Sequence, residues 1–397
     1  MGAAPNEPST GRGGAVVEPP STALPDEAYV IALASLDHLG PRRLVALLDA
    51  FDPASAWRVV SLGRVVAEAP PALIDALGTH AEKIETDWRR QAVRLSPAQL
   101  WERHVASGIG IALRAAASFP TPFVDDIEPP SIIFSSGDPD VIVGPRVAIV
   151  GTRDCTRYGY DIARQLGAEL SDAGVGVVSG LALGIDGAAH TGALDVHGAP
   201  PVAVVGSGLD VVYPRRHADL WRRVAERGVV LTEHPLGTKP VAWHFPARNR
   251  LIVALADLVI VVESQLTGGS MHTVEEAVRR DVPVLAVPGP VTSKVSSGTN
   301  KLLYDGMSVC RDPADVLVAL GLEPGGRRKA AERRPAPSAE DRAILEAFEW
   351  QPATFDHLVL RTGRDLLDLT VALDRLADAG WVDRRGGWYE RIAKPGG

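Results

Sequence analysis

Two arginines and a glycine-rich turn lie close together in the chain and have the chemistry of a phosphate site. Arg248 and Arg250 belong to the segment Phe-Pro-Ala-Arg-Asn-Arg, which is followed by an apolar run and by the turn Thr-Gly-Gly-Ser at residues 267–270. Backbone N–H groups at the start of a helix, with fixed cations nearby, bind phosphate oxygens. We therefore interpret the stretch from Arg248 to Thr273 as a site for the backbone of a nucleic acid.

The two arginines are not expected to have the same role. Side chains two positions apart on one helix point in different directions, so one arginine is expected to be structural and to pair with Glu233 or Glu263. The other is expected to contact phosphate as a bidentate donor. Phe245, which follows Trp243 and His244, provides either a stacking face for an unpaired base or a side chain for the core.

Asp186 and His190 are a second pair with possible chemistry. Their spacing of four places both on one face of a helix, as general acid–base catalysis would need. No nucleophile accompanies them in the sequence. We interpret Asp186 as an N-terminal cap and His190 as a packed histidine, and we predict no catalytic residue.

The elements that must position these residues show an α/β pattern. Short valine-rich runs alternate with helical segments, as strands buried on both faces of a parallel sheet require. The runs are 147–150, 175–178, 202–205, 229–231, 258–262 and 284–287. The pattern predicts a doubly wound, mostly parallel Rossmann-like sheet, whose ligands bind beyond the carboxyl ends of the strands. Arg153 follows the first of these strands and is expected at that crevice.

Several function classes are excluded by what the 397 residues lack. The dinucleotide fingerprint GxGxxG and the P-loop GxxxxGK[ST] do not occur, which argues against a dinucleotide cofactor and a P-loop ATPase. The two cysteines, Cys155 and Cys310, lie outside any CxxC pattern, so neither a zinc site nor a disulfide framework is expected. The sequence therefore predicts no metal and no cofactor.

Charge and hydropathy indicate a cytoplasmic protein without a membrane partner. The longest apolar run, 251–262, is broken by Asp257 and is shorter than the roughly 20 residues that cross a bilayer. The N-terminal residues contain no apolar stretch of a signal peptide. The formal net charge is −8, so a nucleic-acid site must be a concentrated cationic patch on an acidic body.

Composition divides the chain into six segments. They are a disordered tail (1–26), a helical module (27–114), an extended connection (115–145), a Rossmann-like DNA-binding domain (146–320), a linker (321–338) and a winged-helix-like module (339–391).

The two smaller modules carry weaker signals. In the helical module, Gly40–Pro41 resembles a helix-hairpin-helix (SAM-like) turn, although a small packing domain is the favoured interpretation. The third helix of the C-terminal module carries four aspartates, which repel a phosphate-lined groove. This module is expected to meet a protein rather than to read DNA; the aspartates are Asp365, Asp368, Asp374 and Asp378.

Six motifs in a fixed order add a family resemblance. They are Gly-Thr-Arg at 151–153, Ser-Gly-Leu-Ala-Leu-Gly-Ile-Asp at 179–186, Gly-Ser-Gly-Leu-Asp at 206–210, Phe-Pro-Ala-Arg-Asn-Arg at 245–250, Pro-Gly at 288–289 and Gly-Thr-Asn at 298–300. Over about 147–317 the chain resembles the DNA-processing protein A family (DprA, also called Smf).

The resemblance implies a protein that binds and protects single-stranded DNA and loads the RecA recombinase on it during natural transformation and recombination. It also implies no enzymatic turnover and a homodimer formed through the α/β domain. Family members often carry a lysine before the Phe-Pro pair, and Lys239 is the nearest here. The DNA-binding residues implied by the motifs are Gly151, Arg153, Lys239, Phe245, Arg248, Asn249, Arg250, Gly268, Gly269 and Ser270.

One enzyme alternative shares the same glycine turn. Gly-Gly followed by Thr273 and an acid at Glu275 or Glu276 resembles the nucleoside-monophosphate phosphoribohydrolases, which hold phosphate on the turn and use a glutamate for chemistry. The companion motifs of that family are missing, so the DNA-binding interpretation is preferred.

Overall fold

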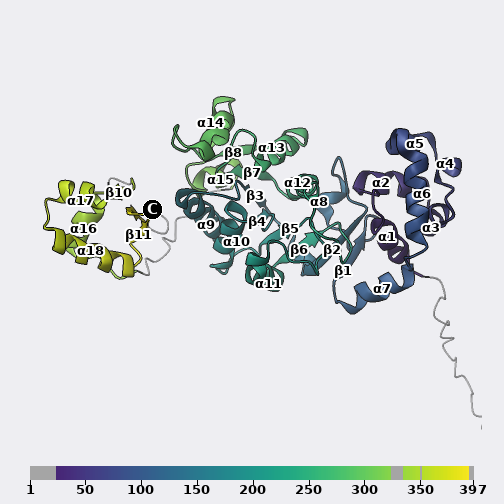
Figure 1. The fold of residues 1–397 in the computed structure, drawn as a ribbon, viewed down its shortest axis with the longest axis horizontal. Helices are drawn as coiled ribbons and strands as arrows, with labels where there is room; N and C mark the ends of the chain where they lie inside the picture. Colours follow the sequence, from purple (N-terminus) through teal and green to yellow (C-terminus); the bar gives the residue numbers. More distant parts are fainter. Residues whose placement is uncertain (1–23, 323–333, 349–350, 393–397) are drawn as a thin grey trace, which may run out of the picture. The chain divides into compact units, whose positions relative to one another are not determined.

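The computed structural model describes residues 24–322, 334–348 and 351–392. The chain forms two compact units, 1–107 and 108–397, which are described separately. Figure 1 shows their helices and strands. Residues 1–23 of the predicted tail and 323–333 of the predicted linker lie outside the described residues.

The first unit is helical. Its turn at Gly40 lies directly before α2, where Pro41 occupies the first helical position and has no N–H to donate. Arg43 donates to the carbonyl oxygens of His38 (2.8 Å) and Ala76 (3.2 Å), so it ties the turn to its own unit. The helices are α1 (Asp26–Ala34), α2 (Pro41–Ala50), α3 (Pro53–Leu62), α4 (Val65–Glu68), α5 (Pro71–Leu77), α6 (Ala81–Ala92) and α7 (Pro97–Ala106).

The second unit is built on a nine-stranded sheet with the order β1-β2-β6-β5-β4-β3-β7-β8-β9. The pairs from β6 to β9 are parallel, while β1 and β2 are antiparallel additions at one edge. The strands are β1 (Gly110–Leu113), β2 (Ile132–Gly137), β3 (Arg146–Val150), β4 (Gly176–Ser179), β5 (Val202–Val204), β6 (Val229–Thr232), β7 (Leu258–Val261), β8 (Val284–Ala286) and β9 (Ser308–Val309).

The six valine-rich runs correspond to β3 through β8, so the predicted mostly parallel Rossmann-like sheet is confirmed. The secondary structure expected for the residues before the sheet, 27–145, was wrong in one respect. Strand β2 falls in the segment expected to be an extended connection, and β1 falls in the expected helical module. Both strands lack the valine-rich run of a central strand, and their partners are decided by tertiary pairing.

Helices cover both faces of the sheet. Successive strand residues point to opposite faces, so Val147 and Ile149 pack in one hydrophobic core, and Ala148 and Val150 pack in the other. The first core includes residues of α9 (Arg157–Asp172), α10 (Ile185–Leu194) and α15 (Pro313–Ala319), and α11 (Ala218–Arg227) packs beside α10. The second takes α8 (Thr121–Val124), α12 (His244–Ala254), α13 (Gly269–Arg279) and α14 (Ser297–Tyr304).

The order of the strands places a switch point between β3 and β7. From β3 the chain adds β4, β5 and β6 on one side and then returns to add β7, β8 and β9 on the other. Connections leave two neighbouring strands in opposite directions at such a point, which opens a crevice at their carboxyl ends.

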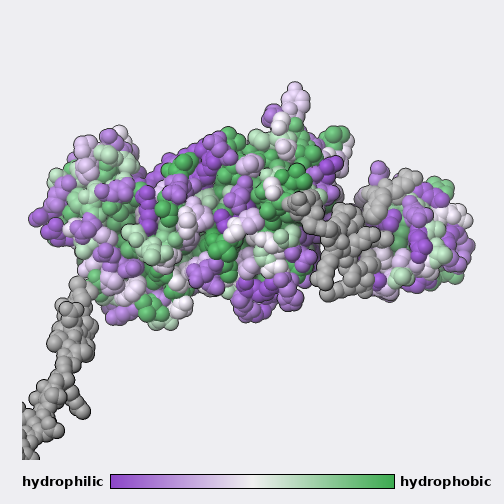
Figure 2. Space-filling model, turned by 180° about the vertical axis from the view of Figure 1, so that it is seen from behind, coloured by the Kyte–Doolittle hydropathy of each residue, from purple (hydrophilic) through white to green (hydrophobic). Residues whose placement is uncertain are grey.

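The described residues of the C-terminal module form the three helices and the hairpin that the sequence predicted, with one short additional strand between the first two helices. Its core includes Phe348, Leu373 and Trp381, while Asp368, Asp374 and Asp378 lie on the exposed side of α18. Figure 2 shows one face of the whole molecule, on which hydrophilic and hydrophobic side chains are interspersed. The elements are α16 (Ala339–Glu346), β10 (Ala353–Thr354), α17 (Phe355–Thr362), α18 (Leu366–Asp378), β11 (Val382–Arg385) and β12 (Trp388–Arg391).

In the described parts of the chain, no helix is both long and apolar enough to cross a bilayer. The same residues contain no group of three or more His, Cys, Asp or Glu side chains arranged to hold a metal ion.

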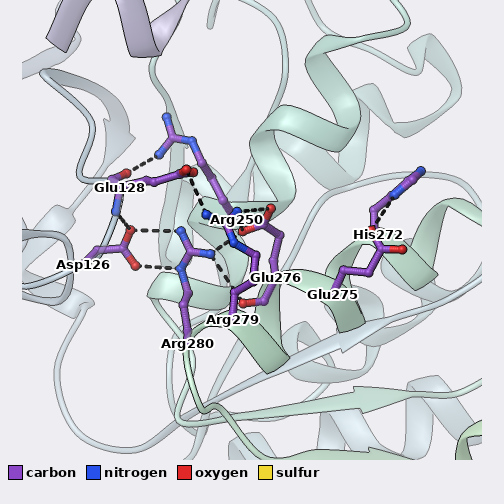
Figure 3. A network of polar contacts seen from close by, with 8 residues as sticks. All are labelled: Asp126, Glu128, Arg250, His272, Glu275, Glu276, Arg279 and Arg280. Carbon is purple, nitrogen blue, oxygen red and sulfur yellow. Dashed lines mark hydrogen bonds and ion pairs between the residues drawn. The ribbon is translucent and has the colours of Figure 1, made fainter. Parts of the chain in front are cut away.

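A network of ion pairs fastens the loop after α8 to the helices on the second face (Figure 3). Arg280 makes two hydrogen bonds to Asp126, of 2.7 and 3.0 Å, and both side chains are about 95% buried. Arg280 also pairs with Glu276, and Arg279 joins Glu276 to Glu128 at 3.0 Å each. The network holds α13 in a fixed position relative to the sheet.

Replacement of Asp126 by alanine is expected to destabilise the second unit by about 3–5 kcal/mol, because Arg280 would keep a buried charge with one acid fewer. Urea unfolding measures this change. Arg222→Ala is the control, since Arg222 and its two acidic partners are exposed and should leave the midpoint nearly unchanged. Equal midpoints for the two variants would contradict the structural role of the network.

Candidate nucleic-acid interface

A cavity of about 730 Å³ opens at the carboxyl ends of β3 and β7, the switch point of the sheet. Its walls come from the turns after these two strands and from the first turns of α12 and α13. Eight of the ten residues predicted for DNA binding line it: Gly151, Arg153, Phe245, Arg248, Asn249, Gly268, Gly269 and Ser270. Lys239 and Arg250 are not among the described residues that line the cavity.

The glycine turn leads directly into a helix. Gly268 is the N-cap of α13 and Gly269 its first residue. The N–H of Met271 donates to the carbonyl of Gly268 at 2.9 Å, and the N–H groups before it in the first turn have no acceptor one helical turn earlier. The Ser270 hydroxyl donates to the Ser264 hydroxyl at 2.7 Å, which holds the turn on the end of β7. A side chain at position 269 would meet no atom within 4 Å, so the backbone there is open to a ligand.

Two helix N-termini therefore border one cavity. Phe245 and Pro246, in the first turn of α12, line it together with Gly269 and Ser270 at the start of α13. The N-terminus of a helix carries a partial positive charge, which favours an anion.

Arg153 supplies the exposed cation of the cavity. Its guanidinium carbon lies 4.8 Å from the centre of the Phe245 ring, and the Tyr213 ring lies 5.5 Å from the same ring. The N–H of Thr152 donates to the carbonyl of Glu263 at 2.8 Å, so the turn that carries Arg153 is tied to the end of β7. Tyr213 was not among the residues predicted for the site.

Arg248 lies beneath the cavity rather than on its rim. It is 4% exposed, and its Nη2 donates to the carbonyl of Gly180 at 3.2 Å. Within the described residues, its Nε has no hydrogen-bond partner. Burial lowers the pKa of this guanidinium to about 10 while the nearby Asp186 carboxylate opposes the shift, so Arg248 stays charged at neutral pH.

Arg250 is the structural member of the pair. It pairs with the buried carboxylate of Glu233 and donates to the carbonyl of Glu128 at 2.8 Å. The pairing with Glu233, one of the two that the sequence allowed, is confirmed. Glu263 instead accepts from the N–H and hydroxyl of Thr156, at 2.9 and 2.6 Å, and so holds the N-cap residue of α9.

Asp186 and His190 are both buried, and of the two only Asp186 lines the cavity. Asp186 accepts from the N–H of Gly180 at 3.1 Å, and burial raises the pKa of its carboxyl group against the opposing effect of Arg248. His190 is fully buried on the same helix, and burial lowers the pKa of its ring to about 3. His190 is therefore neutral at physiological pH.

The acids of the enzyme alternative lie away from the cavity. Glu276 pairs with Arg279 and Arg280, and Glu275 lies beside His272 at 3.2 Å (Figure 3). Neither glutamate is among the described lining residues. Among the described residues, the cavity that contains the glycine turn is thus lined by Arg153, Arg248 and Asp186 and by no glutamate.

Comparison with known proteins matches residues 111–321 to the family of DNA recombination-mediator protein A. The chain belongs to this family. A Mycobacterium tuberculosis relative is 38% identical over 261 residues, which cover 64% of this chain and 66% of the relative. Protein Smf of Escherichia coli is 32% identical over 283 residues, covering 70% of this chain and 75% of Smf.

A solved structure supports the same assignment. The structure of DNA processing protein A from Streptococcus pneumoniae superposes with a TM-score of 0.60 and 27% identity, covering 74% of this chain and 98% of that one. The family match ends at residue 321, so the C-terminal module lies outside it.

Gly180→Ala is expected to destabilise the protein by at least about 1–3 kcal/mol, because a Cβ at this position would overlap the Arg248 guanidinium. Chemical denaturation measures the loss. Gly269→Ala is the matched control, since its Cβ would meet open space at a helix start, and its stability should equal or exceed that of the wild type. If Gly180→Ala is as stable as the wild type, the Arg248 guanidinium does not lie against position 180.

Acid should destabilise the protein through His190. The unfolded ring binds a proton below about pH 6.5, while the folded ring, with a pKa of about 3, does not. Stability from this residue is therefore lost as pH falls from about 6.5 toward 3, by up to about 1.4 kcal/mol per pH unit. Urea midpoints between pH 7 and 5 should fall less steeply in His190→Gln than in the wild type. Parallel slopes would contradict a buried neutral ring.

Proposed function

We propose that this chain binds single-stranded DNA at the cavity and acts as a recombination mediator without catalysing a reaction. The observation that supports this most directly is the convergence of two helix N-termini, exposed Arg153 and buried Arg248 on one crevice. Backbone N–H groups and arginines are the donors that bind phosphate oxygens.

A single strand suits the cavity better than a duplex. The site is a recess at the switch point of the sheet, and Phe245 and Tyr213 contribute aromatic side chains to its wall. Unpaired bases can turn toward such rings, while paired bases are stacked inside the helix. The family description, DNA recombination-mediator protein A, and the name of the solved relative, DNA processing protein A, agree with DNA as the ligand.

We extend the proposal to the partners that the family resemblance implies. The chain would protect incoming DNA and load RecA on it during natural transformation or another recombination pathway in the cytoplasm, as a homodimer formed through the α/β domain. Strand exchange by RecA on DNA coated with single-strand binding protein tests loading, and light scattering tests the dimer. If RecA is not loaded, or if no dimer forms, that part of the proposal is wrong. The proposal that the chain binds DNA is not affected by either result.

Arg153→Ala should weaken binding of a fluorescent dT20 at 100 mM NaCl by about tenfold, because it removes the exposed cation of the cavity. Anisotropy titrations from 50 to 300 mM NaCl should also show a smaller dependence on salt for this variant. Arg222→Ala, which removes an exposed arginine of α11, is the charge-matched control and should bind as the wild type does.

A 20-base-pair duplex completes the experiment. The wild type is expected to prefer dT20 over this duplex. Equal affinity for the two, or equal loss in both arginine variants, would contradict a single-strand site at the cavity.

A further inference from the structure

The loops that follow β5 and β6 form a rigid shelf at the same edge of the sheet as the cavity. We call residues 205–216 and 233–243 the loop shelf. The N–H of Gly208 donates to the carbonyl of Thr238 at 3.0 Å, and the N–H of Gly237 donates to the Asp210 carboxylate at 2.7 Å. The two loops are thus joined to each other as well as to the sheet.

The loop shelf borders the cavity directly. Tyr213, Pro240 and Ala242 belong to the shelf and also line the cavity. Since β5 and β6 lie on the β4 side of β3, a strand that leaves the cavity in that direction runs over this shelf.

Trp243 is more exposed than Tyr213, the other large aromatic side chain of the shelf, which is 41% exposed. Trp243 is 56% exposed, and its indole ring meets the His244 ring edge-on, with 4.2 Å between centroids and 79° between planes. His244 is itself fixed, because its Nδ1 lies 3.0 Å from the carbonyl of Gly206 and its ring stacks on His234 at 4.1 Å. The indole is therefore held in place while more than half of its surface faces solvent.

The ring of Phe245 is less available than the indole. Arg153 lies over it and Tyr213 packs against it, and the residue is only partly exposed. Of the two aromatic residues that flank His244, Trp243 has the freer face for a planar ligand.

Unpaired cations accompany Trp243 on the shelf. Arg215 and Arg216 directly follow Pro214, Lys239 lies four residues before Trp243, and all three side chains are exposed. Within the described residues none of the three has an ion pair with a carboxylate. Free arginines and lysines beside an exposed aromatic ring are the pattern of a surface that binds unpaired polynucleotide.

We propose that Trp243 forms a second base-binding subsite, where the indole stacks on an unpaired nucleobase of the strand held by the cavity. This subsite rests on the proposed function and specifies which part of the ligand the shelf recognises. Because every base has an aromatic face, the subsite accepts any base sequence and depends on the bases being present.

The experiment compares dT20 with an abasic 20-mer that has the same phosphates and no bases. Trp243→Ala should weaken binding of dT20 by between about fivefold and 100-fold and leave binding of the abasic strand unchanged. Trp243→Phe keeps an aromatic face and should recover most of the affinity. Trp388→Ala is the matched control, since Trp388 is 50% exposed on the C-terminal hairpin and should not affect either ligand.

Four results overturn the proposal and can be told apart. If Trp243→Ala binds dT20 as the wild type does, or if Trp388→Ala loses as much, the subsite is wrong and the proposed function stands. If Trp243→Ala weakens both ligands equally, the tryptophan shapes the shelf and does not stack. If the wild type fails to bind dT20 at all, the proposed function fails as well.

Discussion

The contact between a buried guanidinium and a glycine is the constraint on which the site depends. Arg248 reaches the carbonyl of Gly180 only because position 180 has no side chain, and Asp186 binds the N–H of the same glycine from the other side. Burial disfavours both charges, yet the arginine stays protonated because its pKa of about 10 is well above neutrality. The end of β4, the start of α10 and the middle of α12 are thereby joined under the cavity.

The three arginines in and beside the cavity differ in burial and in their partners. Arg250 is turned inward and neutralised by Glu233, Arg248 is buried at the floor with an unpaired Nε, and Arg153 is exposed. Around them, the paired acids of the loop after α8 hold α13 against the sheet (Figure 3). This rigidity matters because a helix N-terminus attracts an anion only within its first turn.

The sequence predicted the central sheet and the grouping of the site well, because both depend on local signals. Valine-rich runs identify strands buried on two faces, and residues after such strands must meet at one edge. Which arginine turns inward was left open, since burial depends on a partner such as Glu233, 17 residues away. The antiparallel strands β1 and β2 were missed for the same reason, as pairing and not composition makes them strands. The exposure of Trp243 likewise follows from how His244 packs on His234.

An acidic protein can hold a cationic site because electrostatic fields are local in salt water. At physiological ionic strength the screening length is about 8 Å, so distant carboxylates contribute little at the cavity. The carboxylates near α13 are also neutralised, since Glu276 pairs with both Arg279 and Arg280. The net charge of −8 then repels polyanions from the rest of the surface. An anion is therefore favoured at the crevice, where exposed Arg153 and the start of α13 lie together.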